Sequence, residues 1–255
     1  MASALASRPF RDKLAGDRKQ TWDLALPDIT LLDYLAFAFY VASWFGYTLF
    51  ADYSPWRRRS IMKTMDAYRE QWMQQMLRRE HRIVDANIIG SLQNGAAFFA
   101  STTIFALGGL IAALGASEQA MGILSTLHMD EFATAETWQI KVLLMIAIMA
   151  YAFFKFAWTF RLQNYCAVLL GATSVETEPG LDDTAMAHRV ARISALAARH
   201  FNRGLRAYFF ALAGLAWFVH PVLFIVMIVY VLYVLHRREF RSKSLKVLRI
   251  KSDEF

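Results

Sequence analysis

Residues 207–235 read AYFFALAGLAWFVHPVLFIVMIVYVLYVL, an apolar block that His220 and Pro221 interrupt near its middle. As one helix the block would extend about 43 Å, which exceeds the hydrocarbon core of a bilayer, about 30 Å. Pro221 lacks a backbone donor and disfavours helical backbone at His220. Two interpretations fit this stretch. One is a single kinked span, and the other is a hairpin of segments 207–219 and 222–235 that turns at His220-Pro221.

Three further apolar blocks lie upstream, at residues 29–50, 88–115 and 138–160. Each is long enough to cross a bilayer as a helix. Hydrophobic residues make up 56% of the chain and charged residues 19%, which excludes intrinsic disorder. The sequence therefore predicts an all-α integral membrane protein. We expect a bundle of four to five membrane helices, with the last block bent or folded back at His220-Pro221 and amphipathic helices on the cytoplasmic side.

These blocks divide the chain into three parts. A polar N-terminal tail covers residues 1–28, a membrane helical domain covers 29–236, and a basic C-terminal tail covers 237–255. The tail contains no apolar stretch that ends at a small-residue cleavage site. We therefore expect no cleavable signal peptide, and the first span serves as an uncleaved anchor.

The distribution of Lys and Arg favours the hairpin, because positively charged loops stay in the cytoplasm. With five segments and an outer N-terminus, 21 Lys and Arg lie inside and 5 outside. With one kinked span, the division is 14 against 12. Residues 116–137 contain no Lys or Arg and fit an outer loop in both arrangements. The prediction is a multi-pass protein of a bacterial inner (plasma) membrane, with the N-terminus outside and the C-terminus inside.

Two basic stretches predict amphipathic cytoplasmic helices. In residues 56–86, apolar side chains recur at helical spacing, at Ile61, Met65, Tyr68, Trp72, Met76 and Ile83. This helix forms either a packed elbow between two spans or a surface that contacts lipid. A second helix is expected after Asp182-Asp183, because acidic residues favour a helix N-terminus. Nucleic-acid binding is not expected, because every basic cluster adjoins a membrane segment.

The block at 88–115 carries small and polar residues every seven positions, at Asn87, Asn94, Ser101, Gly108 and Gly115, and Thr102 widens this stripe. Small residues let membrane helices approach closely, and Asn or Ser can hydrogen-bond across the contact. The stripe predicts either a tight helix–helix seam or the lining of a polar pathway. A homo-oligomer axis would satisfy both interpretations.

Charged residues inside predicted spans are candidate functional groups. Lys155 lies within the third block, about 9 Å along a helix from Arg161, so its side chain either reaches the cytoplasmic boundary or faces the interior. Asp33 lies near the outer end of the first block. On the cytoplasmic side, Arg78, Arg79 and Arg82 form a basic cluster, and the spacing of Arg82 and Asp85 predicts a pair on one helix or with a neighbouring helix.

The sequence contains no recognisable catalytic motif. The six histidines are scattered, HExxH, GxSxG and the P-loop pattern do not occur, and the single cysteine, Cys166, is interpreted as a packing residue. We therefore expect no enzymatic activity, no metal and no cofactor. The leading hypothesis is a small homo-oligomeric channel or transport-like protein. The alternative is a structural or accessory subunit of a larger membrane complex. The expected partners are membrane lipids and either further copies or that complex, without nucleic acid.

Several motifs are similar to those of a known family. The runs at 79–86 (REHRIVDA) and 94–103 (NGAAFFASTT), Gly108-Gly109-Leu110, the run at 202–208 (NRGLRAY), Ala216-Trp217-Phe218, Pro221 and the run at 238–241 (REFR) carry the resemblance. They resemble an uncharacterised multi-span membrane family of bacteria and plants that is catalogued as a domain of unknown function. The resemblance extends over roughly residues 29–242. It implies a multi-span helical protein and no particular activity or site residue.

Overall fold

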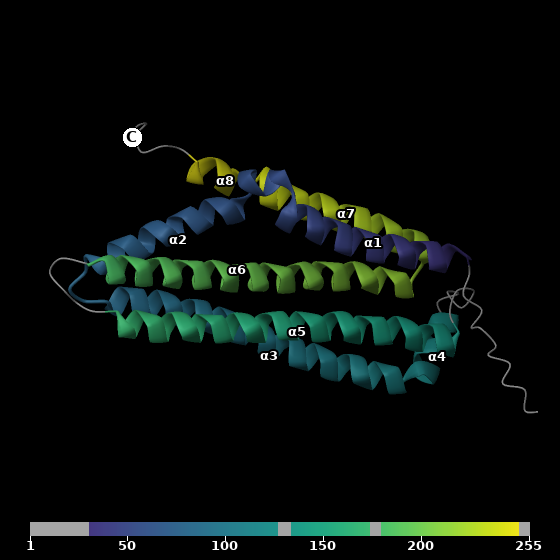
Figure 1. Ribbon diagram of the computed structural model, residues 1–255. Coiled ribbons are helices and arrows are strands. Elements are labelled where there is room, and N and C mark those ends of the chain that lie inside the picture. The colour runs from purple at the N-terminus through teal and green to yellow at the C-terminus, as the bar shows by residue number, and fades with distance from the viewer. Residues whose placement is uncertain (1–30, 127–133, 174–179, 250–255) are drawn as a thin grey trace, which may run out of the picture.

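A computed structural model describes residues 31–126, 134–173 and 180–249 (Figure 1). Every regular element within these ranges is a helix. The elements are α1 (Leu31–Tyr53), η1 (Pro55–Arg59), α2 (Ile61–Leu77), α3 (Ile83–Gly115), α4 (Ser117–Thr126), α5 (Ala135–Ala172), α6 (Leu181–Leu215), η3 (Ala216–Phe218), α7 (Pro221–Phe240) and α8 (Lys243–Leu248).

Four helical stretches are long and apolar enough to cross a membrane: α1, α3, α5 and the stretch Pro221–Leu248. The predicted all-α membrane protein is thereby confirmed. The fifth predicted segment, 207–219, is not a separate helix. Residues 207–215 are the end of α6, and η3 follows them. The earlier turns of α6 are rich in Arg and other polar residues, so this helix as a whole is less apolar than the other four.

Along the chain, each of the long helices α3, α5, α6 and α7 runs antiparallel to the long helix before it (Figure 1). In this view α6 lies in the middle, with α1 and α7 on one side and α5 and α3 on the other. Aromatic side chains of α1 also reach α5, as in the edge contact of Trp44 with Tyr151, whose ring centroids are 5.4 Å apart. The α2–α3 connection, the end of α5 and the start of α6 lie at one end of the molecule, and α4 and the α6–α7 turn lie at the other.

The two ends differ in composition. We call the end that contains α2, α8, the starts of α3 and α6 and the close of α5 the basic half, because most Arg and Lys residues lie there. The other end, which contains most of α1 and α7, is called the apolar half. The helices α3, α5 and α6 pass through both halves. At 1.5 Å per residue they measure about 50, 57 and 52 Å, well beyond the thickness of a hydrocarbon core.

These helices extend past the predicted boundaries for a physical reason. The prediction for 138–160 ended where the sequence turns polar at Arg161, yet α5 continues to Ala172. Along this extension Leu162, Cys166 and Leu170 recur at helical spacing and are buried. Cys166 and Leu170 join a hydrophobic core with α2 and α6 that includes Met73, Met76 and Val190. Helix packing in the basic half therefore replaces the membrane as the apolar environment.

The break at His220-Pro221 is confirmed. His220 has extended backbone with φ −162° and ψ 137°, and its Nδ1 accepts a hydrogen bond of 3.0 Å from the amide of Val222. Pro221 occupies the first helical position, where a missing backbone donor has little consequence. The chain turns here and α7 returns beside α6 (Figure 1), as the hairpin interpretation expects.

The helix predicted within 56–86 is α2, which packs on α6 as an elbow and buries Met73, Met76 and Leu77. Two residues of its predicted apolar face are not buried in this packing. Tyr68 is exposed and donates a hydrogen bond of 3.0 Å to the carbonyl of Leu248 in α8, and Ile83 is exposed at the start of α3. The helical spacing correctly predicted a helix over α2, but the predicted face also included Ile83, which belongs to α3.

Candidate functional site

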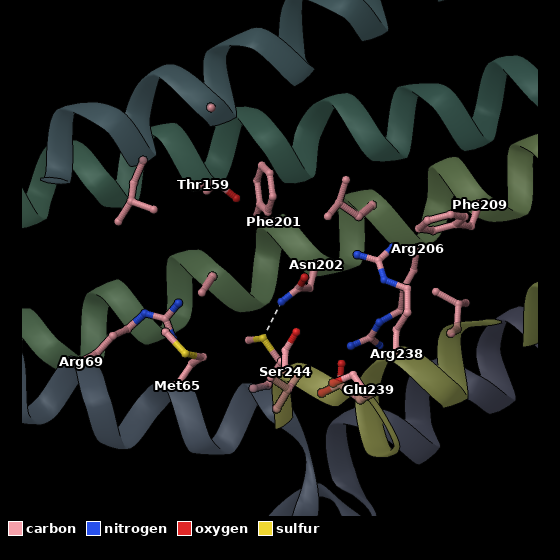
Figure 2. Close-up of a pocket in the computed structure, with 18 of the residues that line it drawn as sticks. Met65, Arg69, Thr159, Phe201, Asn202, Arg206, Phe209, Arg238, Glu239 and Ser244 are labelled. Carbon is pink, nitrogen blue, oxygen red and sulfur yellow. Dashed lines mark hydrogen bonds between the residues drawn. The ribbon is translucent and has the colours of Figure 1, made fainter. Parts of the chain in front are cut away.

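A cavity of about 590 Å³ lies where the apolar and basic halves meet. The cavity is lined by residues of seven helices, α1, α2, α3, α5, α6, α7 and α8 (Figure 2). We call it the arginine cavity. Its polar lining residues are Arg69, Ser91, Thr159, Gln163, Asn202, Arg206, Arg238, Glu239, Ser242 and Ser244. The apolar lining includes Tyr47, Leu92, Phe201, Leu205, Phe209 and Leu235.

Arg206 is the most deeply buried cation of this lining, at 8% exposure. Its Nη2 donates a hydrogen bond of 2.8 Å to Asp52 Oδ1, and its guanidinium lies 5.8 Å from the ring centre of Tyr47. Arg203, one turn earlier on α6, donates from Nε to the other oxygen of Asp52 at 2.7 Å. Two guanidinium groups thus share one carboxylate, which leaves a positive charge in excess. Among the described residues, Arg206 Nη1 is buried and has no hydrogen-bond partner.

Arg238 reaches the same end of the cavity from the last turns of α7 (Figure 2). Its guanidinium lies 5.3 Å from the ring centre of Phe209. The neighbouring Glu239 contributes a carboxylate to the same lining and interacts with the charge of Arg206. It supplies one negative charge beside the two arginines Arg206 and Arg238, so it only partly offsets their positive field.

Arg69 lies at the opposite end of the cavity in Figure 2. It forms an ion pair of 3.4 Å with Asp66, three residues earlier on α2. Burial lowers the pKa of the Arg69 guanidinium, and the charge of Asp66 opposes that shift. Arginine keeps its charge at physiological pH in spite of such shifts. The cavity therefore carries cationic groups at both ends.

Gln163 on α5 contributes a buried acceptor to the lining. The residue is 3% exposed. Among the described residues, its Oε1 has no hydrogen-bond donor. Nearby on α6, Asn202 donates from its amide nitrogen to the sulfur of Met62. A buried acceptor without a donor costs free energy, about 1–3 kcal/mol, unless something else in the cavity supplies a donor.

Several Trp, Tyr and Arg side chains lie at the end of α1 and on the turns of α5 that contribute to the cavity. Trp56, just after α1, is half-exposed, and the guanidinium of Arg59 lies 5.6 Å from its ring. On α5, Arg161 lies 5.8 Å from the ring of Trp158 and donates to the hydroxyl of Tyr165 at 2.6 Å. Trp, Tyr and Arg are typical of membrane–water boundaries. Thr159 and Gln163, which line the cavity, lie among Trp158, Arg161 and Tyr165 on α5. The cavity therefore lies at the same level along α5 as these side chains.

A second buried polar cluster lies in the apolar half, near the other end of α1. Trp217 Nε1 donates to Asp33 Oδ1 at 2.7 Å, and Lys141 Nζ lies 3.8 Å from the same oxygen. Lys141 also donates to the carbonyl of Trp217 at 3.1 Å. The cluster ties α1, α5 and η3 together. Asp33, predicted to be an intramembrane charge, therefore accepts a hydrogen bond from Trp217 and forms an ion pair with Lys141.

The predicted stripe on α3 lies outside the arginine cavity. Its five members are exposed, at Asn87, Asn94, Ser101, Gly108 and Gly115. A Cβ added at Gly108 or Gly115 would meet nothing within 4 Å. Thr102 turns its hydroxyl to the carbonyl of Phe98 in its own helix. The neighbouring Thr103 is the residue that faces the bundle, where it hydrogen-bonds the Tyr208 hydroxyl at 2.7 Å.

The predicted basic cluster lies at the far end of the basic half. Asp85 accepts hydrogen bonds from Trp72 Nε1, at 2.7 Å, and from Arg79. Arg82 donates to the carbonyl of Thr173 at 2.6 Å, and Arg78 is exposed at the end of α2. These contacts join the α2–α3 corner to the end of α5. The cluster is therefore separate from the α3 stripe. The stripe members after Asn87 lie further along α3, toward the apolar half.

Lys155 is half-buried on α5, with Nζ 4.8 Å from the ring centre of Tyr151. It lies one turn before Thr159 and therefore close to the level of the cavity. Cys166, interpreted as a packing residue, is fully buried. Within residues 31–126, 134–173 and 180–249, no three His, Cys, Asp or Glu side chains gather to hold a metal ion.

Sequence reasoning did not single out Asp52, Gln163, Arg206 or Arg238 as one site. Each lies at or just beyond the end of an apolar block, where a charged or polar residue is also explained by membrane topology. Their spacing along the chain does not indicate that they meet. Lys141 could have been identified from the sequence as part of a buried ion pair. It lies inside the predicted span 138–160, where a lysine needs a partner.

The family comparison agrees with the resemblance found in the sequence. The family model described as "Protein of unknown function, DUF599" matches residues 35–244. This range contains every residue that lines the arginine cavity. No curated protein and no solved structure matches the chain.

Proposed function

We propose that this chain, which belongs to the DUF599 family, is a transport-like membrane protein that takes an anion into the arginine cavity. The observation that carries the proposal is Arg206, a nearly fully buried cation that lines a cavity of about 590 Å³ and whose Nη1 has no hydrogen-bond partner in the part of the chain that the structure describes. A buried guanidinium with an unused donor is stabilised strongly by an anion, because charge-assisted hydrogen bonds strengthen in a water-poor site.

The proposed membrane placement puts this cavity at the cytoplasmic boundary. Five segments cross the bilayer, with 207–219 of α6 and 222–235 of α7 as a hairpin. The N-terminus lies outside and the C-terminus inside, since the Lys and Arg residues concentrate in the basic half. The apolar half then spans the bilayer of a bacterial inner membrane. The basic half projects into the cytoplasm, and the cavity opens between them.

The chemistry of the lining is suited to binding rather than to catalysis. Its cations are arginines, which hold their charge and present planar arrays of donors. The lining carboxylate, Glu239, interacts with the charge of Arg206 in the same cavity. We therefore propose a protein without enzymatic activity that binds an anionic solute or head group reversibly.

The exposed α3 stripe supports a homo-oligomer as the functional unit. Membrane helices with small residues on one face associate closely through that face. In this proposal two or more copies pack through Gly108 and Gly115, and Asn94 and Ser101 line the contact or a shared polar path. Asn94→Leu is then expected to abolish flux and leave the thermal stability unchanged.

Anion flux and binding test the proposal directly. Purified protein in phosphatidylcholine liposomes is loaded with radiolabelled sulfate, and its release is compared with that from protein-free liposomes. Arg238→Gln, which removes a cavity cation, is expected to lower flux and sulfate binding at least tenfold. Arg237→Gln is the matched control, because Arg237 lies on the same turn of α7 and, unlike Arg238, does not line the cavity. Equal flux in both variants would contradict the proposal.

The second candidate is an accessory subunit of a larger membrane complex, and the same exposed stripe on α3 favours it. The native mass of the protein, extracted gently from its own membranes, separates the two. A homo-oligomer that Gly108→Leu dissociates supports the transport-like protein. A second protein in fixed ratio, lost in the same variant, supports the accessory subunit.

A further inference from the structure

We infer that Lys155 and Arg203 hold the phosphate of an anionic phospholipid from the cytoplasmic leaflet, at a site on α5 and α6 outside the arginine cavity. Neither residue lines that cavity. The inference goes beyond the proposed function, because this lipid site does not depend on an anion in the cavity. It uses only the membrane placement given above.

Lys155 and Arg203 lie at the same level of two neighbouring helices. Phe156 packs against Gly204, where an added Cβ would lie 2.6 Å from a ring atom of Phe156. Lys155 and Arg203 each come one residue before this contact, and α5 and α6 run antiparallel (Figure 1). The charge of Arg203 accordingly acts on Lys155. Two cations from two helices therefore meet at one place on the bundle.

Positive charge exceeds negative charge around these two residues. Among the described residues Lys155 forms no ion pair, and its Nζ lies 4.8 Å from the ring centre of Tyr151. Arg203 shares the carboxylate of Asp52 with Arg206. One carboxylate thus serves two guanidinium groups before the lysine is counted. A cation at membrane depth is costly without a counter-charge, so an anion from the surroundings stabilises it.

His200 reports the same positive field. Burial, followed by the charges of Lys155 and Arg203, lowers the pKa of the His200 imidazole to about 4. The imidazole is therefore neutral at physiological pH, and it brings no negative charge to the cluster. The two cations remain available to an external anion.

The neighbouring side chains indicate that this anion belongs to a lipid. Phe154, next to Lys155, is exposed, and Trp158 is half-exposed one turn later. Both lie in a helix that is apolar enough to cross the membrane, so acyl chains cover this surface. Asp52 holds Arg203 near the end of the first membrane helix, which is the depth of lipid phosphates. A soluble anion would have to leave water to reach the same depth.

The charge excess favours an anionic head group over a zwitterionic one. A phosphate offers oxygens to both Lys155 and Arg203 in charge-assisted hydrogen bonds. In phosphatidylcholine the phosphate is followed by a quaternary ammonium group, which the same two cations repel. In phosphatidylglycerol a neutral glycerol takes that place, so the attraction is kept without the repulsion.

Two lipids with identical acyl chains test the inference on the full chain. Native mass spectrometry in detergent compares the binding of phosphatidylglycerol and phosphatidylcholine. We expect phosphatidylglycerol to bind about fivefold more tightly, and Lys155→Gln to remove most of this preference. Lys155→Arg keeps the charge and should retain it. Arg237→Gln is the matched control, because it removes one exposed cation from the end of α7 and lowers the net charge equally.

A measurement on the wild-type protein keeps the inference testable even if Lys155→Gln does not fold. Lysine acetylation in nanodiscs, mapped by peptide mass spectrometry, compares Lys155 with Lys63, which is exposed on α2. A small fraction of phosphatidylglycerol in phosphatidylcholine should protect Lys155 and leave Lys63 unchanged. Equal acetylation of Lys155 with and without phosphatidylglycerol would overturn the inference.

The variants also separate this inference from the proposed function. Equal loss of the lipid preference in Lys155→Gln and Arg237→Gln would show attraction by overall charge alone and refute the site. Loss in Arg238→Gln but not in Lys155→Gln would place the lipid in the arginine cavity, which refutes the inference and supports the proposed function. An intact preference in a protein that neither binds nor releases sulfate would refute the proposed function and support the lipid site.

Discussion

Arg206 on α6 and Asp52 near the end of α1 form a hydrogen-bonded ion pair of 2.8 Å, although 154 residues separate them along the chain. Both side chains are about nine-tenths buried, and Arg203 holds the second oxygen of the same carboxylate. The pair thus fixes the end of the first membrane helix against α6 beside the arginine cavity. It also keeps Arg206 Nη2 occupied, so that Nη1 is the donor left for a ligand.

Asp52→Asn is expected to destabilise the protein by about 3 kcal/mol, because it removes the carboxylate that pairs with Arg203 and with the nearly buried Arg206. Unfolding in detergent, followed by tryptophan fluorescence, measures the loss. Glu70→Gln is the control. Its pair with His188 lies at the surface, with side chains 36% and 53% exposed, and its removal should cost about 1 kcal/mol or less. Equal losses in the two variants would contradict this role for Asp52.

Asp33 and Lys141 are expected to be energetically coupled. Lys141→Met alone leaves a buried carboxylate without its cation, and Asp33→Leu alone leaves a buried ammonium group. Each single variant should therefore be less stable than the double variant Asp33→Leu/Lys141→Met, in which neither charge remains. A double-mutant cycle on unfolding free energies should give a coupling of about 1–3 kcal/mol. Simple additivity of the two single losses would show that the pair contributes nothing.

Gly204 is expected to be intolerant of a methyl group. A Cβ there would lie 2.6 Å from a ring atom of Phe156, which is itself fully buried between α5 and α6. Gly204→Ala should therefore destabilise the protein by about 1–3 kcal/mol. At Gly46 of α1 the added Cβ meets nothing within 4 Å, so Gly46→Ala should be neutral or slightly stabilising. Thermal unfolding of the two variants gives the comparison, and a harmless Gly204→Ala would disprove the close approach.

The five-segment topology predicts opposite labelling at the two ends of the molecule. Cys166 is buried, so a cysteine-free background made with Cys166→Ala should fold. In that background Ser117→Cys, at the start of α4, should react with a membrane-impermeant maleimide in intact cells. Arg78→Cys, at the end of α2, should react only after the cells are opened. Labelling of Arg78→Cys in intact cells would refute the orientation.

A reporter fused after residue 255 provides an independent test of the same topology. Activity of a cytoplasmic reporter is expected there, because α7 returns to the basic half after the turn at Pro221. An outer C-terminus would show that residues 207–235 cross the bilayer once.

Much of the architecture was predictable because it depends on local properties of the chain. Apolar blocks identified the membrane segments, and the chemistry of proline placed the break at His220-Pro221. The boundaries of α5 were less predictable. Its last turns look polar in composition, and they remain helical because Cys166 and Leu170 pack against α2 and α6.

The arginine cavity was not predictable in the same way. Arg206, Arg238 and Gln163 lie on three helices, and each is explained separately by its place at a membrane boundary. Periodicity did identify the α3 stripe as one face of a helix. It contained no information on what that face contacts, and in the structure the face is exposed while Thr103, one position on from Thr102, meets Tyr208.

The sequence by itself thus determined the helical membrane class, the positions of the apolar segments and the break in the last block, because composition and backbone stereochemistry act within a few turns of helix. Only the tertiary structure decided which charges meet. The pairs Asp52–Arg206 and Asp33–Lys141 join residues far apart in the chain, and their energies depend on burial and distance rather than on spacing. The cavity between the two halves arises from those same long-range contacts.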